Sequence, residues 1–260
     1  MNRQRGFTLM EMIAVMAILA VLSAIIAPSI VDTVNDAYAK AEDANLDQIA
    51  DDLELYIRRN GVIPSGNIGD WSNALATLSS APSTELAANR RGYQRMLYFD
   101  PSFFGGGSFG GYVQSGGLTA PPASPRVMII SDLRGNVAGQ GNNAGRFDDI
   151  WNQNPGARIV ESDTVKIRRI NLGHLFKEVL ISTNSLNAPG VSLNGAPAIA
   201  VPAAVGTVDG LLLLYVLEDT RLSLLGDPFP VGSLQSVYKV KEDLGLRYED
   251  AGGTPIWVLP

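Results

Sequence analysis

The chain has 260 residues, enough for one large domain or for one domain with an anchor, and its formal net charge is −6. This acidic balance, without a block of lysine and arginine, argues against nucleic acid as a general partner. The sequence has no cysteine and a single histidine, His174, which excludes disulfides, thiolate chemistry, cysteine-based zinc sites and two-histidine metal motifs.

The first predicted element is an apolar helix near the amino terminus. From Met12 to Val31 the sequence runs for 20 residues without a charged side chain, and a helix of that length spans about 30 Å, the thickness of a bilayer's hydrocarbon core. Arg3 and Arg5 precede this run and Asp32 follows it, so the positive-inside rule places the amino terminus in the cytoplasm and the rest of the chain outside. Because the run is longer than the apolar region of a secretory signal peptide, we expect a single membrane-spanning helix.

The residues just before this run carry a processing signal. The segment Gly6-Phe7-Thr8-Leu9-Met10-Glu11 follows a short basic leader, and it resembles the prepilin-peptidase site of type IV pilins and pseudopilins. The resemblance implies that a prepilin peptidase cleaves after Gly6 and that Phe7 becomes an N-methylated amino terminus. Arg3 and Arg5 supply the leader's positive charge.

Glu11 is a carboxylate at the edge of the apolar run, and an acidic residue in a membrane helix is costly without a partner. Taken alone, it would be interpreted as a side chain that reaches the cytoplasmic interface. Cleavage after Gly6, however, creates a positively charged amine on Phe7. In a bundle of apolar helices, this amine and the carboxylate of a neighbouring subunit offset each other's desolvation at one axial stagger only. We therefore interpret Glu11 as a device that sets the register between subunits.

Pro28 lies inside the apolar run, where pilins and pseudopilins very often have proline. It has no N–H, and its ring crowds the carbonyl of Ala24, so we expect the helix to bend or loosen at this point. A weak point there would let the helix repack inside a filament, although a proline that a membrane helix merely tolerates is the alternative.

An amphipathic stem follows, over residues 32–61. Leu46, Ile49, Leu53 and Tyr56 recur at helical spacing, and Gly61 provides a stop signal. We predict one continuous helix of about 50 residues, embedded in lipid first and packed on a domain later. The segment from Leu53 to Pro64 also resembles the end of the stem in major pseudopilins of type II secretion systems, although Val62-Ile63 replaces their usual basic-aromatic pair.

Short apolar or alternating segments behind the stem predict strands. They cover residues 126–133, 165–167, 211–217, 236–241 and 255–259, while 175–181 is compatible with helix or strand. We expect 211–217 at the centre of a sheet and 236–241 at an edge, with the glycine-rich residues 105–117 as a long exposed insertion. The fold class is therefore α+β, with the long helix packed on a mostly antiparallel, pilin-like sheet.

Three patterns resemble catalytic or binding motifs but lack the necessary context. Gly105–Gly110 matches G-x-G-x-x-G, yet a loop rather than a helix follows. Major pseudopilins that resemble this chain bind calcium in a carboxyl-terminal loop. The oxygen donors between Asn142 and Asp149 fit no EF-hand spacing, so we interpret them as a solvated loop, with a calcium site as the alternative. His174 has no nucleophile elbow. The remaining acidic candidates are as plausible in caps and turns as in catalysis: Asp100, Asp132 and Asp163. We therefore expect no enzyme, no cofactor and no metal.

The predicted organisation has four parts. They are a prepilin leader at 1–6, a transmembrane and filament-core helix at 7–31, a stem helix at 32–61 and a globular α+β domain at 62–260. We expect a pilus-like filament subunit of the inner membrane, most compatible with a type II secretion pseudopilin. Its expected partners are prepilin peptidase, other pilin or pseudopilin subunits and inner-membrane lipid. A minor pilin of a type IV pilus and a membrane-anchored extracytoplasmic binding protein are the alternatives.

Overall fold

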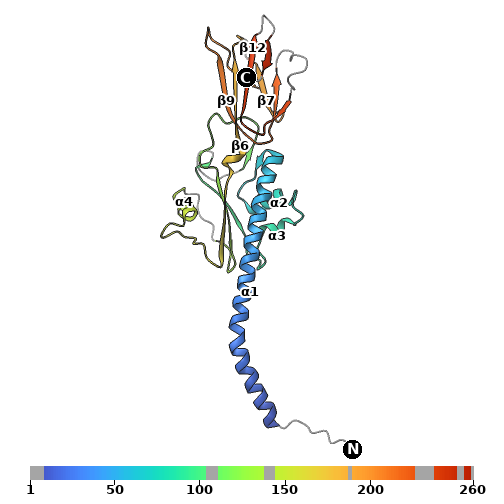
Figure 1. The fold of residues 1–260 in the computed structure, drawn as a ribbon, viewed down its shortest axis with the longest axis vertical. Coiled ribbons are helices and arrows are strands. Elements are labelled where there is room, and N and C mark those ends of the chain that lie inside the picture. The colour runs from blue at the N-terminus through green and yellow to red at the C-terminus, as the bar shows by residue number, and fades with distance from the viewer. Residues whose placement is uncertain are drawn as a thin grey trace, which may run out of the picture.

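The computed structural model describes residues 9–103, 111–137, 144–186, 189–225, 237–250 and 255–258. One long helix supports a lower lobe beside its second half and an upper lobe beyond its end (Figure 1). The helices are α1 (Leu9–Asn60), α2 (Ile68–Ala76), α3 (Ser83–Ala87) and α4 (Ala144–Asn152), with a 3-10 turn at Leu172–Leu175. The strands are β1 (Val62–Ile63), β2 (Met96–Phe99), β3 (Tyr112–Val113), β4 (Arg126–Asp132), β5 (Val165–Asn171), β6 (Phe176–Thr183), β7 (Gly190–Leu193), β8 (Ile199–Ala200), β9 (Gly210–Leu217), β10 (Arg221–Leu225), β11 (Val237–Lys239), β12 (Leu244–Asp250) and β13 (Pro255–Val258).

Helix α1 is continuous over 52 residues, which confirms the single long helix predicted from the sequence. Its buried side chains begin with Ala39 and end with Ile57, so only the second half of the helix packs against the lobes. Gly61 ends the helix in a left-handed conformation, with φ of +62° and its N–H bonded to the Ile57 carbonyl at 2.8 Å. Glycine adopts this conformation without the Cβ clash that other residues meet.

The lower lobe consists of α2, α3, α4 and the antiparallel sheet β2-β4-β5. Strand β4 is the central strand, and successive side chains point to opposite faces of the sheet. Val127 and Ile129 belong to the core cluster that contains the buried stem residues. Met128 and Ile130 belong to a second cluster with Phe147 of α4. The sheet is therefore covered on both faces, which explains why the strand 126–133 reads as an apolar run.

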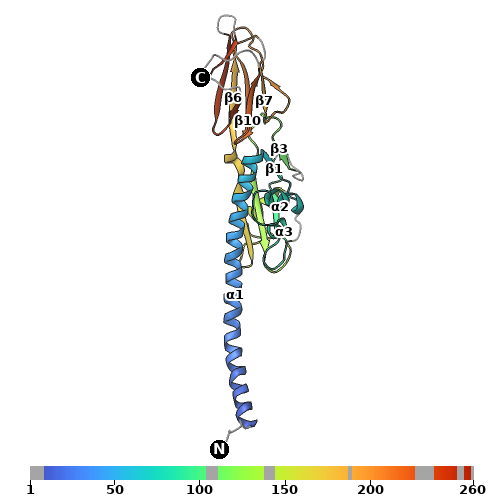
Figure 2. The ribbon, with the colours of Figure 1, turned by 90° about the vertical axis from the view of Figure 1, so that its right-hand side faces the viewer.

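The upper lobe is a pair of four-stranded sheets, β13-β12-β6-β9 and β11-β10-β7-β8 (Figure 2). Both sheets contribute to one apolar cluster, with Val179 and Leu214 from the first and Val191 and Leu222 from the second. Only β6 and β12 pair in parallel, and the other pairs that the structure describes in this lobe are antiparallel. The α+β class with mostly antiparallel strands is thus confirmed, although the strands are divided among separate sheets.

Three sequence expectations are resolved or corrected by this arrangement. Residues 175–181 form a strand rather than a helix, since β6 covers them from Phe176 onward. Residues 211–217 lie in β9, at an edge of the described sheet and not at its centre. Tyr112 and Val113, expected in a loop, pair as β3 with β1 immediately after the stem. The apolar run did not reveal the edge position of β9, because Leu214, Val216 and Leu217 are buried in the lobe. The outer edge of the strand is also partly covered, since Leu118 bonds to the Tyr215 backbone through both its N–H and its carbonyl.

Candidate assembly site on the long helix

The first half of α1 stands clear of both lobes. Every residue from Leu9 to Ala37 is exposed, and an 18-residue window of the helix reaches a mean hydropathy of 2.6 with none of it buried. Among the described residues, α1 is the one helix long and apolar enough to cross a membrane. Its large exposed apolar side chains are Leu9, Met10, Met12, Ile13, Val15, Met16, Ile18, Leu19, Val21, Leu22, Ile25, Ile26, Ile30, Val31 and Val34. A patch of this size requires lipid or other apolar helices to cover it.

Two of the predicted site residues lie within this exposed half. Glu11 occupies the first turn of α1, where the helix macrodipole favours negative charge. Pro28 lies in the helix interior, and the helix continues through it. Near this point, the Ser29 and Thr33 hydroxyls donate to the carbonyls of Ile26 and Ser29, both at 2.8 Å. Bonds of this kind bend helices slightly, and Figure 1 shows α1 curving along its lower half.

The remaining processing residues, Arg3, Arg5, Gly6 and Phe7, lie outside the described residues. Their roles in cleavage and in leader charge stay predictions. The structure does place Glu11 at the start of the apolar surface, within one helical turn of the first described residue, Leu9.

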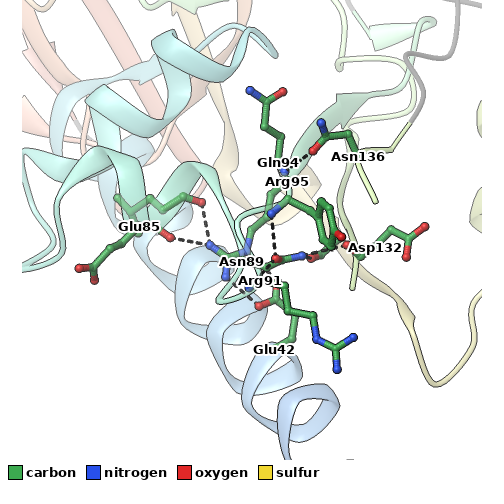
Figure 3. A network of polar contacts seen from close by, with 11 residues as sticks. Glu42, Glu85, Asn89, Arg91, Gln94, Arg95, Asp132 and Asn136 are labelled. Atoms are coloured by element: carbon green, nitrogen blue, oxygen red, sulfur yellow. Dashed lines mark hydrogen bonds and ion pairs between the residues drawn. The ribbon is translucent and has the colours of Figure 1, made fainter. Parts of the chain in front are cut away.

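A buried ion pair fastens the stem to the lower lobe. Arg95 Nε donates to Glu42 Oε1 at 2.6 Å, and Arg95 Nη2 donates to Glu42 Oε2 at 2.8 Å (Figure 3). The remaining guanidinium nitrogen, Nη1, donates to the carbonyls of Glu85 and Leu86 at 2.7 and 2.9 Å. Both ionic side chains are only 2% exposed. Because the bidentate geometry and the two carbonyls satisfy both groups, the pair compensates for much of its own desolvation.

The environment of Glu42 favours its charged form. Burial by itself would raise the pKa of this carboxyl, but the hydrogen bond and positive charge of Arg95, helped by Ser131 and Asn45, lower the pKa below its ordinary value. The carboxylate therefore stays ionised at neutral pH, and protonation in acid weakens the Glu42–Arg95 ion pair.

Arg91 extends this contact toward the point where α1 leaves the lobe. Its guanidinium lies over the Tyr38 ring, 4.8 Å from the centroid. The same group donates to the Asn35 side chain and to the Leu133 carbonyl. Asn89 in turn donates to the Asp132 carbonyl at 2.9 Å, so the segment that bears Arg91 and Arg95 is tied to β4 as well as to α1 (Figure 3).

Strand β5 supplies two further ion pairs along the stem. Lys166 Nζ lies 3.1 Å from Asp43, and Arg168 Nη1 lies 3.1 Å from Asp47. Most of these side chains are substantially exposed to solvent, so each pair contributes at most about 1 kcal/mol. The buried pair is the stronger determinant of where the stem sits.

Sequence reasoning missed Glu42 and Arg95. The predicted stripe of Leu46, Ile49 and Leu53 is buried as expected. The buried face of the helix, however, begins before this stripe, because Ala39 and Glu42 are buried too. Glu42 precedes Leu46 by four residues and therefore lies on the same helix face. An acidic residue in the apolar stripe was the available signal that a basic partner would be found in the domain.

The patterns set aside in the sequence have structural roles where they are described. His174 lies 3.1 Å from Glu54 at the end of the stem. Asp100 and Asp148 both pair with Arg126, and Asp132 accepts from the backbone N–H of Arg134 at 2.8 Å. Asn142, Asn143 and Gly105–Gly110 lie outside the described residues. Within the described part of the chain, no group of three or more His, Cys, Asp or Glu side chains suits a metal ion.

Comparison with known proteins adds to this geometry. The family model of the prokaryotic N-terminal methylation motif matches residues 1–27. The type II secretion system core protein G of Klebsiella pneumoniae is 35% identical over 104 residues, which are 39% of this chain and 71% of that protein. The protein of the same name from Escherichia coli K12 is 31% identical over 103 residues, 38% of this chain and 68% of that protein. No solved structure matches the chain significantly.

A methylation motif followed by a long, exposed apolar helix and a β-rich domain defines a pilin-like subunit anchored by its amino terminus. The match to more than two thirds of two relatives is more specific. The chain belongs to the type II secretion system core protein G family, and it is a pseudopilin subunit.

Proposed function

We propose that this pseudopilin is cleaved after Gly6, methylated on Phe7 and assembled through α1 into the filament of a secretion system. The exposed apolar surface that begins at Leu9 is the observation that supports this function best. Lipid covers that surface before assembly, and the helices of other subunits replace lipid in the filament. Such a subunit is a structural part and performs no catalysis.

The proposal assigns a place to each part of the chain. The leader, residues 1–6, is removed in the cytoplasm, and residues 7–31 span the inner membrane once. The stem, 32–61, and the domain, 62–260, lie on the opposite side of the membrane. The basic leader and the acidic residues Asp32 and Asp36 after the apolar run support this orientation.

Glu11 has a defined role in this proposal. In the low-dielectric helix bundle, its carboxylate pairs with the methylated amine of Phe7 of an adjacent copy. Neither charge is stable there without a partner, and the pair forms at one stagger only. The interaction therefore selects the register between copies more than it adds net stability.

Mass spectrometry of the purified protein tests the processing. In cells with an active prepilin peptidase, the expected species begins at Phe7 and carries one methyl group on its amine. A control variant, Gly6→Ala, is expected to keep all six leader residues. Wild-type protein that begins at Met1 in these cells contradicts the proposal.

Removing the charge of Glu11 tests its role in setting the register between subunits. Replacing Glu11 with leucine is expected to leave cleavage intact but to reduce recovery of the subunit in sheared filaments at least tenfold, because the amine then has no partner. The matched control is Met10→Leu, which alters the neighbouring position without a change of charge. Normal incorporation of Glu11→Leu would remove the assigned role.

A minor, tip-located subunit is the second candidate, and chain size favours it. The 104 residues matched to the Klebsiella pneumoniae relative cover 71% of that protein but only 39% of this chain, so this chain is considerably longer. Quantitative immunoblotting of purified filaments separates the two positions. A shaft subunit is expected as the dominant protein, whereas a tip subunit is expected at a few copies per filament.

A further inference from the structure

A polar cavity of about 280 Å³ lies where the end of α1 meets the upper lobe. Figure 2 shows the upper end of α1 directly below the strands of that lobe. The cavity is lined from two sides. The helix end contributes Arg58, Arg59, Asn60 and Gly61, and the upper lobe contributes Asn194, Asp219, Thr220, Arg221 and Lys239.

Two guanidinium groups around this cavity have no ion-pair partner among the described residues. Arg58 lies 3.7 Å from Glu54 and 3.6 Å from Glu218, and Lys239 pairs with Asp219 at 2.9 Å. Arg59 and Arg221 are exposed. Among the described residues, neither of these two side chains has an ion pair or a side-chain hydrogen bond.

A buried hydroxyl in the wall of the cavity also lacks a hydrogen-bond partner in the described part of the chain. Thr220 is only 2% exposed, and its Oγ1 makes no hydrogen bond within the described residues. A buried hydroxyl without a partner costs free energy. Arg59 and Arg221, which have no ion pair with any described residue, are suited to bind an oxyanion together with this hydroxyl donor. A carboxylate offers guanidinium a bidentate acceptor.

The chain itself offers carboxylates of the right kind. Asp32 and Asp36 are exposed on α1 at the boundary of the apolar run, and within the described residues neither has an ion pair or a hydrogen bond. They precede Arg59 by 27 and 23 residues, which is about 35–40 Å along a helix. They cannot reach the cavity of their own chain.

We propose that this cavity, defined by Arg59, Arg221 and Thr220, receives the carboxylate of Asp32 or Asp36 from a second copy displaced by about 35–40 Å along the filament axis. This inference rests on the proposed function, because copies held in one membrane have their helices at the same height. The contact can form only when the second copy has been raised out of the membrane into a filament. It thus joins the upper lobe of one subunit to the lower stem of another.

Disulfide cross-linking tests the contact, and the absence of cysteine from the chain makes the readout specific. The double variant Asp36→Cys/Arg221→Cys is oxidised in assembled filaments and in the membrane pool. The expected result is covalent dimers and longer ladders in filaments only, lost on reduction. The matched control is Asp51→Cys/Arg221→Cys, because Asp51 is also an exposed stem aspartate but lies only eight residues before Arg59.

Each outcome decides the inference. Filaments that form without a cross-link from Asp36→Cys or Asp32→Cys overturn the contact but leave the proposed function intact. Equal cross-linking from Asp51→Cys, or ladders in the membrane pool, overturns the stated stagger. Failure of the wild-type protein to form filaments would instead contradict the proposed function.

A charge exchange provides a second measurement. Arg221→Glu is expected to reduce filament recovery severalfold, and adding Asp36→Arg to the same chain is expected to restore it. A merely structural role of Arg221 would not produce rescue from a residue about 35 Å away along α1. If the double variant folds normally but filament recovery is not restored, the result counts against the contact.

Discussion

At the scale of single residues, Glu42 and Arg95 govern the attachment of the stem. A buried ion pair is weak evidence for net stability, but loss of one partner leaves an uncompensated buried charge. Glu42→Ala is therefore expected to reduce the free energy of unfolding by about 3–5 kcal/mol. Replacing both residues, as in Glu42→Leu/Arg95→Met, is expected to reduce the free energy of unfolding by less than the single change, because no buried charge remains.

Denaturant unfolding of the wild type, Glu42→Leu, Arg95→Met and Glu42→Leu/Arg95→Met completes a double-mutant cycle that measures this coupling. The exposed pair of Asp47 and Arg168 is the control, for which either alanine substitution is expected to change stability by no more than about 1 kcal/mol. If Glu42→Ala behaved like Asp47→Ala, the buried pair would not determine how the stem is attached to the lower lobe.

At the scale of elements, the end of α1 depends on Gly61. Its φ of +62° is unfavourable for any residue with a Cβ, and a Cβ here would lie 3.1 Å from Asn194 Nδ2. Gly61→Ala is expected to lower stability by about 1–2 kcal/mol, the cost of a left-handed residue with a side chain. Thermal unfolding followed by circular dichroism measures the change. Gly69→Ala is the control, since no atom lies within 4 Å of a Cβ there, and it is expected to be neutral or stabilising.

The elements also show what the sequence can and cannot predict. The extent of helix α1 was predictable, because its signals are local in the sequence. They are the apolar run, the stripe at helical spacing and Gly61 at the end. Strand β4 was predictable because both of its faces are buried. The edge position of β9 and the pairing of Tyr112 with Ile63 depend on partners distant in the chain. The Glu42–Arg95 ion pair and the polar cavity depend on distant partners in the same way, because Glu42 and Arg59 contact or face residues more than 50 positions away in the chain.

At the scale of the whole molecule, acid should loosen the stem from the lobes. Burial alone would raise the pKa of Glu42, but Arg95 lowers it below its ordinary value. A carboxyl whose pKa is lower in the folded protein stabilises the fold above its unfolded pKa, and that contribution is lost as the pH falls through the folded value. The loss therefore begins below about pH 4.3, the ordinary glutamate value, and increases toward lower pH.

Unfolding of the full chain in detergent micelles at pH 7 and near pH 3 measures this dependence. The wild type is expected to lose stability over that interval by more than Glu42→Gln, which is less stable at neutral pH but has no carboxyl to protonate. The difference isolates Glu42 from the other acidic groups, because both proteins share them. Hydrogen exchange is expected to show the loss first in the stem around residue 42, where α1 leaves the lower lobe. Parallel pH profiles for the two proteins would show instead that the attachment of the stem is insensitive to the charge of this pair.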